Sequence, residues 1–150
     1  MNEDVEAALT KDLIVNVFGL VRVANAFAEI LENNQGALVQ LNSVASIKNF
    51  SHLSTHSASK AASYSWTQGL WDDFGKKGAS VLSVHPDPIA TETADQASFN
   101  ETAPTSTVSE GMVSALKAGD FHLFPDNLAK QVEGAYQSFS DTIVMANFSE

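Results

Sequence analysis

The sequence contains no cysteine, which excludes disulfide bonds and any metal site built on thiolates. It has only 8 lysine and arginine residues against 18 aspartate and glutamate residues, a formal net charge of −10. The basic residues are scattered singly, so neither nucleic acid nor an anionic membrane surface is an expected partner. No unbroken run of 18 apolar residues occurs, and we therefore expect no membrane-spanning segment.

The first residues are acidic and lack the basic stretch and apolar run of a secretory signal. Together with the absence of cysteine, this predicts a cytoplasmic location. A chain of 150 residues with 44% apolar residues is long enough to form one hydrophobic core. Since no internal repeat or linker is present, we expect a single domain over residues 1–150.

Apolar residues at helical spacing predict helices over residues 3–32, 56–74, 109–117 and 126–147. Asn2 is the expected N-cap of the first helix, and Gly36 is its expected left-handed terminator. Ser109 is the expected N-cap of the third helix.

Short apolar runs predict strands over residues 37–42, 80–84 and 121–124. Helices and strands therefore alternate along the chain, which is typical of a parallel sheet. The predicted fold is α/β, with about three parallel strands and flanking helices.

The stretch from Asn42 to Lys60 joins the end of the first strand to the start of the second helix. Ser43 follows the carboxyl end of the strand, where ligands bind in open α/β sheets. His56 and Lys60 are four residues apart, a spacing that puts both side chains on one helix face. The pattern predicts a site that combines a hydroxyl, an imidazole and an amine.

This stretch resembles the active-site segment of short-chain dehydrogenases/reductases. There, a catalytic Ser at a strand end is followed 13 residues later by a helix that begins Tyr-x-x-x-Lys. Ser43 and Lys60 fit that spacing, and His56 occupies the Tyr position. The run L-I-V-N-V-F-G resembles the family's fourth helix, so Asn16 matches the Asn that loosens that helix and holds a water in the proton relay. The resemblance implies a catalytic set of Asn16, Ser43, His56 and Lys60.

The resemblance also implies an oxidoreductase that uses NAD(P) on small-molecule carbonyl or alcohol substrates. In the family, Lys60 would bind the ribose. Pro86 and Thr91 match the segment P-G-x-x-x-T, whose Thr bonds the nicotinamide carboxamide, while Asp87 replaces its Gly. Residues 92–108 correspond to the family's mobile substrate loop.

The sequence departs from the family most strongly in what precedes the first strand. None of its 8 glycines forms the Gly-x-Gly turn that receives a pyrophosphate, and the family's Asn-Asn-Ala-Gly run is also missing. The resemblance covers about the carboxyl-terminal three-fifths of a family domain. We therefore expect a truncated, Rossmann-like partial domain that does not bind NAD(P) by itself.

The His56 substitution changes the chemistry that the site can perform. Neutral imidazole is a far weaker acid than phenol, and the charge of Lys60 one turn away favours the neutral ring. A neutral His56 is a competent general base but a poor substitute for the proton-donating Tyr. Carbonyl reduction is therefore expected to be weak or silent, and whether the chain is an enzyme stays open.

Two other classes of function are compatible with the sequence. Ser43, His56 and Asp87 could supply the nucleophile, base and orienting acid of a cofactor-independent hydrolase or lyase, although Ser43 lacks the Gly-x-Ser-x-Gly turn. The chain could instead be a non-catalytic dimerisation or binding module. Only His52 and His56 have i, i+4 zinc spacing, and they straddle a helix start, so no metal site is expected.

Self-association is the expected partner interaction. Helices 3–32 and 56–74 correspond to the family's usual dimer faces and carry large apolar side chains (Phe18, Phe27, Trp66 and Trp71). The uncharged strand 37–42 is a second route, because the strand that normally pairs with it is missing and its edge would stay open. Either route predicts a homodimer.

Overall fold

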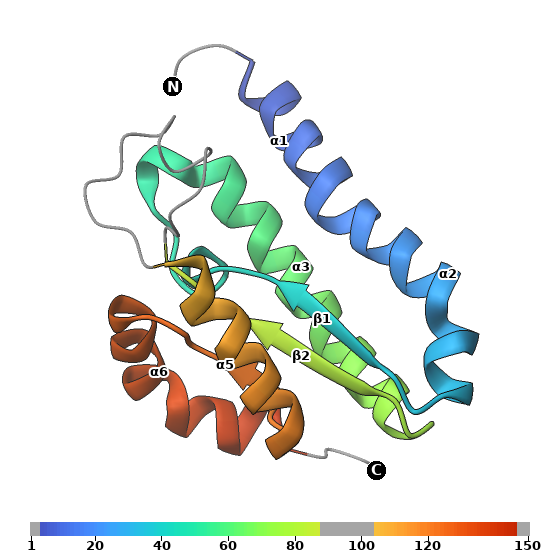
Figure 1. Ribbon diagram of the computed structural model, residues 1–150. Coiled ribbons are helices and arrows are strands. Elements are labelled where there is room, and N and C mark those ends of the chain that lie inside the picture. Colours follow the sequence, from blue (N-terminus) through green and yellow to red (C-terminus); the bar gives the residue numbers. More distant parts are fainter. Residues whose placement is uncertain (1–3, 88–103, 147–150) are drawn as a thin grey trace.

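The computed structural model describes residues 4–87 and 104–146, and its centre is one sheet of three parallel strands. The strands are β1 (Ala37–Leu41), β2 (Ser80–Val84) and β3 (His122–Leu123), in the order β1-β2-β3. Figure 1 shows the two long strands side by side, with Ala37 opposite Ser80 and Leu41 opposite Val84. The predicted α/β fold with about three parallel strands is confirmed, although β3 is shorter than residues 121–124.

The first helix runs without a break through α1 (Val5–Leu13), the π-helical turn η1 (Ile14–Phe18) and α2 (Gly19–Asn33). Asp4 is its N-cap, since the carboxylate of Asp4 accepts a hydrogen bond from the Ala7 amide at 3.0 Å. The predicted cap Asn2 lies outside the described residues. The long predicted helix is therefore confirmed, with a widened turn in its middle.

The turn from α2 into β1 differs from the prediction. Gln35, not Gly36, adopts the left-handed conformation, with φ at 50°. Gly36 is required for a different reason, because a Cβ there would lie 2.9 Å from Cδ2 of Leu31. The small residue lets the chain pass close to the end of α2 before it enters the sheet.

The remaining helices are α3 (Ser54–Gly75), α5 (Thr105–Ala118) and α6 (Asn127–Phe139), which continues into the π-helical turn η4 (Ser140–Val144). The prediction that Ser109 caps α5 is wrong, since α5 begins four residues earlier, and residues 105–108 belong to this helix rather than to a loop. Asp126 caps α6 by accepting a hydrogen bond from the Ala129 amide at 2.9 Å.

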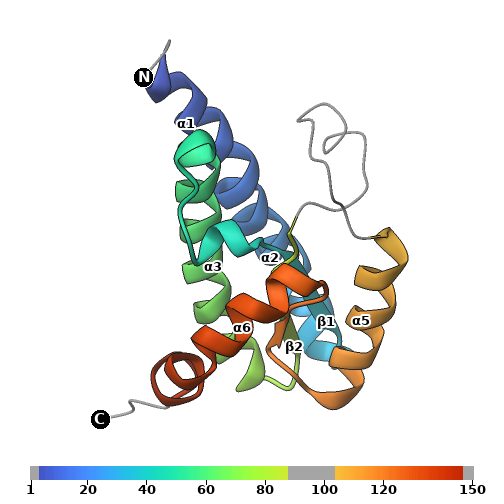
Figure 2. The ribbon, with the colours of Figure 1, turned by 90° about the vertical axis from the view of Figure 1, so that its left-hand side faces the viewer.

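The strands lie between two helical layers. Figure 2 shows α3 on one side of β1 and β2, and α5 on the other. On the α3 side, Leu38 and Val81 pack in one cluster with Leu20 and Phe74. On the α5 side, Leu82 and Val84 pack with Val108 and Ala115. Both faces of β2 are therefore covered, as expected for a parallel strand.

The helix of residues 5–33 leaves much of its apolar surface exposed. By length and composition it could cross a membrane, although a core helix of a soluble protein passes the same test. The criterion of an unbroken apolar run does not detect this helix. In this fold α1 contacts α3 and α2 contacts β1, so the helix is part of the α/β layer arrangement.

Candidate functional site

Ser43 lies immediately beyond the carboxyl end of β1. Its backbone is extended, and its Oγ accepts a hydrogen bond from the Ala45 amide at 3.1 Å, which begins the short 3-10 helix η2 (Val44–Ser46). The Val44 amide donates to the Pro86 carbonyl at 3.1 Å. This bond joins the segments that follow β1 and β2. Ser43 therefore lies at the carboxyl end of the sheet, where the sequence predicts it.

The Lys60 side chain reaches the same end of the sheet from the second turn of α3. Its Nζ donates a hydrogen bond to the Leu41 carbonyl at 2.7 Å, two residues before Ser43. Burial lowers the pKa of Lys60 below its ordinary value. The amine is thus held beside Ser43 by the last residue of β1.

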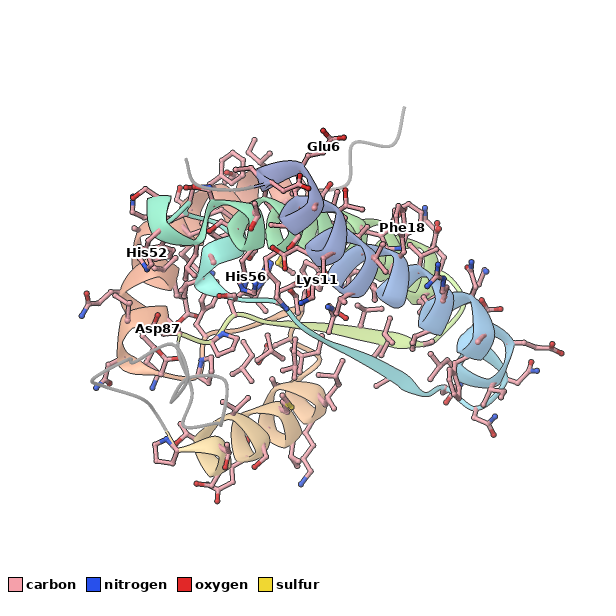
Figure 3. The ribbon with its side chains drawn as sticks, turned by 90° about the horizontal axis from the view of Figure 1, so that it is seen from above. Glu6, Lys11, Phe18, His52, His56 and Asp87 are labelled. Atoms are coloured by element: carbon pink, nitrogen blue, oxygen red, sulfur yellow. The ribbon has the colours of Figure 1, made fainter. Side chains whose placement is uncertain are left out.

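His56 lies in the first turn of α3, half-buried against α1. Burial lowers its pKa most, the charge of Lys60 lowers it further, and the charge of Asp12 opposes both. Figure 3 shows His56 between α3 and α1, near the ends of the strands. The lowered pKa favours the neutral ring, and burial is the main cause of the shift, with Lys60 the second.

Asn16 lies at the centre of the π-helical turn η1. Its Nδ2 donates to Ser59 Oγ at 2.9 Å, and Ser59 Oγ donates to the His56 carbonyl at 2.8 Å. π-Helical turns inside α-helices occur frequently at functional sites. The widened turn places Asn16 two hydrogen bonds away from the His56 backbone, in agreement with the loosened helix that the resemblance implied.

Asp87 does not join these residues. Its amide donates to Asp126 Oδ2 at 2.9 Å, and burial together with the Asp126 charge raises the pKa of Asp87 to about 6. Among the described residues, no hydrogen bond links the His56 ring to Ser43 or to Asp87. The carboxylate that acts on His56 is that of Asp12 instead. The geometry thus gives no support to a Ser43–His56–Asp87 triad.

The remaining predicted site residues concern cofactors and metals. Pro86 contributes its carbonyl to the bond with Val44, and Thr91 lies outside the described residues. Within residues 4–87 and 104–146, no group of three or more His, Asp or Glu side chains is arranged to hold a metal ion.

A buried polar network beneath the site is absent from the sequence-based interpretation. The His85 side chain is fully buried, with Nδ1 3.0 Å from Ser46 Oγ and Nε2 2.8 Å from Ser83 Oγ. Ser46 Oγ uses its one hydrogen in the bond to the Ser43 carbonyl. Its bond with His85 therefore requires a hydrogen on His85 Nδ1. Burial disfavours the charged ring and lowers the pKa of His85 to about 3, so the neutral ring carries its hydrogen on Nδ1.

From His85 the network extends to side chains of β2, of α3 and of the residue that follows β1. Asn42 Nδ2 donates to Ser83 Oγ at 2.8 Å, and Asn42 Oδ1 accepts from Ser63 Oγ at 2.9 Å. Ser83 in β2 and His85 just after it alternate with apolar residues, and this alternation is the one sequence signal that could have indicated the network. It fixes the backbone from which Ser43 projects.

Tyr64 forms a second buried cluster with His122. Its hydroxyl lies 2.7 Å from His122 Nε2 and 3.1 Å from the Tyr136 hydroxyl, and burial raises its pKa. Burial lowers the pKa of His122 to about 4. Tyr64 therefore serves the packing of α6 against α3.

The described residues at the N-terminus of α6 do not suit a phosphate group. A pyrophosphate needs backbone amides and a helix N-terminus without nearby negative charge. The α6 N-terminus is capped by the Asp126 carboxylate, and Asp87 adds a second carboxylate beside it. The end of the sheet beside α6 therefore repels a phosphate group instead of binding it.

Known short-chain dehydrogenases are similar to this chain. The model of the family described as short chain dehydrogenase matches residues 1–102. Over 98 residues, the chain is 31% identical to the NADPH-dependent 1-acyldihydroxyacetone phosphate reductase of Saccharomyces cerevisiae, which covers 65% of this chain and 33% of that protein. It is 28% identical over 81 residues to estradiol 17-beta-dehydrogenase 2 of Rattus norvegicus, covering 54% of this chain and 21% of that protein.

Solved structures share the fold. A short chain dehydrogenase from Burkholderia cenocepacia in complex with NADP superposes with a TM-score of 0.82 at 24% identity, over 97% of this chain and 62% of that one. One from Sphingobium yanoikuyae in complex with NADPH gives 0.68 at 23% identity, over 91% and 57%. The chain thus spans about a third or less of these curated relatives and about three-fifths of these solved chains.

Proposed function

We propose, because this chain belongs to the short-chain dehydrogenase family, that it carries the carbonyl-facing part of an NAD(P)-dependent oxidoreductase. By itself it is weak or silent in carbonyl reduction. The observation that carries this proposal is the cluster at the carboxyl end of β1. There Lys60 donates a hydrogen bond to the Leu41 carbonyl, near Ser43. Asn16 is linked to the His56 carbonyl by two hydrogen bonds through Ser59.

Each side chain of this cluster has a role that its chemistry supports. The Ser43 hydroxyl can polarise a small carbonyl compound, and the half-buried Lys60 amine adds positive charge at the strand end. His56, neutral at pH 7 because its pKa is lowered, can accept a proton but is a poor donor. The arrangement favours binding of a small carbonyl or alcohol compound over its reduction.

Weak cofactor binding follows from what the chain offers to a phosphate. Its sequence has no Gly-x-Gly turn, and Asp87 and Asp126 put two carboxylates beyond the end of β2. At pH 7 most of the Asp87 carboxyl is ionised, since its pKa is about 6. NAD(P) therefore belongs to this chain by family resemblance, and the chain alone lacks the surface that would hold the adenosine half.

Calorimetric titration of the whole chain with NADPH and with NADH tests the proposal. We expect no binding in the micromolar range, where the binding free energy is roughly −8 kcal/mol. A micromolar Kd for either cofactor would overturn the proposal. Absorbance at the nicotinamide band with small ketones and aldehydes should show no turnover above the rate without protein.

Two variants sharpen this test. His56→Tyr restores the proton donor but not the phosphate site, so carbonyl reduction should stay absent; recovery of reduction would mean that a cofactor site exists after all. Hydrolysis of an activated ester is the activity that a Ser43–His56–Asp87 arrangement would give. An esterase rate that disappears in both Ser43→Ala and His56→Ala would replace the proposal with the hydrolase.

We also propose a cytoplasmic location, based on the absence of cysteine. The exposed apolar helix of residues 5–33 is the feature that would argue against it. Fractionation of cells that express the chain should recover it with the soluble proteins. Recovery in the membrane fraction that resists carbonate washing would refute this location.

A further inference from the structure

A closed ring of hydrogen bonds lies behind the Ser43 backbone. It begins at Asn42, the residue just before Ser43, whose Nδ2 donates to Ser83 Oγ at 2.8 Å. Ser83 Oγ lies 2.8 Å from His85 Nε2, and His85 Nδ1 lies 3.0 Å from Ser46 Oγ. Ser46 Oγ donates to the Ser43 carbonyl, and this bond closes the ring. The two halves of the ring therefore meet at the His85 imidazole.

Each hydrogen of this ring has one place to go. The hydrogen between His85 and Ser46 is on Nδ1, so the neutral imidazole has a bare nitrogen at Nε2. Ser83 Oγ therefore donates to Nε2 and accepts from Asn42 Nδ2. All four bonds run in one direction, from Asn42 to the Ser43 carbonyl, and bonds in such a chain strengthen one another. Turning the imidazole over would break both of its bonds.

The ring of hydrogen bonds is closed to water. None of its four side chains is more than 8% exposed, and those of Ser83 and His85 are fully buried. A broken bond would therefore leave a buried polar atom without a partner, which is costly. Phe124 stacks on the imidazole with centroids 4.9 Å apart, and Tyr64 meets it edge-on at 4.7 Å. These two aromatic rings fix the plane of the imidazole.

Ser43 is held on both sides of its Cα. The ring holds its carbonyl, and the preceding Asn42 amide donates to the Val84 carbonyl at 2.8 Å. The Ser43 backbone is extended, with φ at −172° and ψ at 161°, and its Oγ accepts from the Ala45 amide at 3.1 Å. Among the described residues, no acceptor takes the hydroxyl hydrogen of Ser43. That hydrogen is the one that the site can offer to a carbonyl compound.

We propose that His85 is a positioning residue, which through Ser46 holds the Ser43 backbone so that the Ser43 hydroxyl donates to a small carbonyl compound beyond the end of β1. This role of His85 rests on the carbonyl binding proposed above for Ser43. His85 does not touch the compound, since its side chain is fully buried. Supporting bonds of this kind keep the groups of a site in their productive geometry.

A positioning role and a purely structural role differ in which atom of His85 matters. A histidine that only stabilises the sheet would be affected by the loss of either of its bonds. A positioning histidine depends on the Nδ1–H that Ser46 accepts. The side-chain amide of Asn places an N–H near the position of Nδ1, whereas that of the longer Gln lies near Nε2, where it can bond Ser83 and not Ser46. The two amides therefore separate the two halves of the ring.

Binding of cyclohexanone to the whole chain, followed by NMR titration of backbone amides, tests the proposal. We expect Ser43→Ala and His85→Gln to weaken binding about fivefold or more, the effect of one lost hydrogen bond. Ser46→Ala should weaken it less, because His85 Nδ1 already lies 3.3 Å from the Ser43 carbonyl and can bond it directly. His85→Asn should bind within about twofold of the wild type.

His122→Asn is the matched control for these variants. The His122 ring lies next to that of His85, with centroids 5.6 Å apart, but its bonds are to Tyr64 and Ser140, outside the hydrogen-bonded ring. This variant should change stability and leave cyclohexanone binding as it is in the wild type.

Nitrogen-15 NMR of the wild-type imidazole needs neither a variant nor a ligand. At pH 7 we expect the His85 hydrogen on Nδ1 and a bare Nε2. A hydrogen on Nε2 would overturn the proposal, because Ser46 would then have to donate to Nδ1 and would leave the Ser43 carbonyl without its donor.

Exchange of the Ala45 amide reports on Ser43 without a ligand, because the acceptor of this amide is Ser43 Oγ. The amide should exchange faster with solvent in His85→Gln and Ser46→Ala than in the wild type. His85→Asn should keep its protection. Equal exchange rates in all four proteins would contradict the positioning role.

The outcomes separate this proposal from the proposed function. Unchanged binding in Ser43→Ala, or no binding to the wild type, would remove the carbonyl-binding role of Ser43, and exchange of the Ala45 amide would then decide whether His85 holds Ser43 in place. Weaker binding in Ser43→Ala together with wild-type binding in His85→Gln would overturn the positioning role alone. So would equal losses in His85→Asn and His85→Gln, because a purely structural histidine gives that result.

Discussion

The two buried histidines should make this fold sensitive to mild acid. Burial lowers the pKa of His85 to about 3 and that of His122 to about 4, from an ordinary value of 6.5. The unfolded chain therefore binds more protons than the folded one between about pH 6.5 and pH 3–4. Stability from the neutral rings is fully present above pH 6.5 and is lost as the pH falls through that window.

The size of the loss follows from these values. Between pH 7.5 and pH 5, each histidine costs about 2 kcal/mol of unfolding free energy, together about 4 kcal/mol. Asp87 acts in the opposite direction, because its pKa is raised to about 6 and the folded chain gains its proton first. That side chain is partly exposed, so after solvent screening it restores about 1 kcal/mol at most. A net loss of about 3 kcal/mol is a large part of a small domain's stability.

Urea unfolding at one protein concentration, followed by tryptophan fluorescence from pH 5 to pH 7.5, measures this loss. Near pH 5.5 the slope of unfolding free energy against pH should be about 2 kcal/mol per pH unit in the wild type. His85→Asn and His122→Asn should each reduce it by about 1.3 kcal/mol per pH unit, whatever they do to overall stability. His52→Asn, at an exposed position, is the control. If neither buried variant changes the slope, the assignment of acid sensitivity to these rings is wrong.

Three further predictions concern single contacts. Lys60→Met should raise the pKa of His56 and Asp12→Asn should lower it, because the two charges act on the ring in opposite directions; NMR titration of the ring protons measures both, and an unchanged pKa in Asp12→Asn would contradict the contact. Asn16→Ala should lower the unfolding free energy by about 1 kcal/mol through loss of the bond to Ser59, while the exposed Asn25→Ala should cost little; equal effects in urea unfolding would contradict a role for that bond. Tyr64→Phe should lower the unfolding free energy by about 1–3 kcal/mol, because it leaves His122 Nε2 and the Tyr136 hydroxyl without their partner. Tyr136→Phe should lower it less. The reverse order in thermal unfolding would show that Tyr64 is not the centre of the cluster.

Local patterns were sufficient for much of the fold. Helical periodicity located the helix of residues 5–33, and apolar runs located β1 and β2, because each depends on residues a few positions apart. Helix ends were less certain: Ser109 looked like an N-cap, yet α5 begins at Thr105. The position of an N-cap depends on the direction of the segment before the helix. Hydrophobic periodicity carries no information about that direction.

The spacing of Ser43, His56 and Lys60 was also readable from the sequence, since one strand end and one helix turn define it. Their partners were not. Asp12 acts on His56 from another helix, and Lys60 bonds a backbone carbonyl 19 residues away. Such contacts depend on how helices pack on the sheet, and no short window of sequence contains that information.

Burial decided the chemistry that composition left open. His85 and His122 look like ordinary histidines in the sequence, but the sheet and α6 enclose them beside Tyr64, and this keeps both rings neutral. Sequence alone determined which residues could form the site and the strands, because those choices are local. Only the tertiary structure decided which groups lose water, because desolvation depends on everything packed around them.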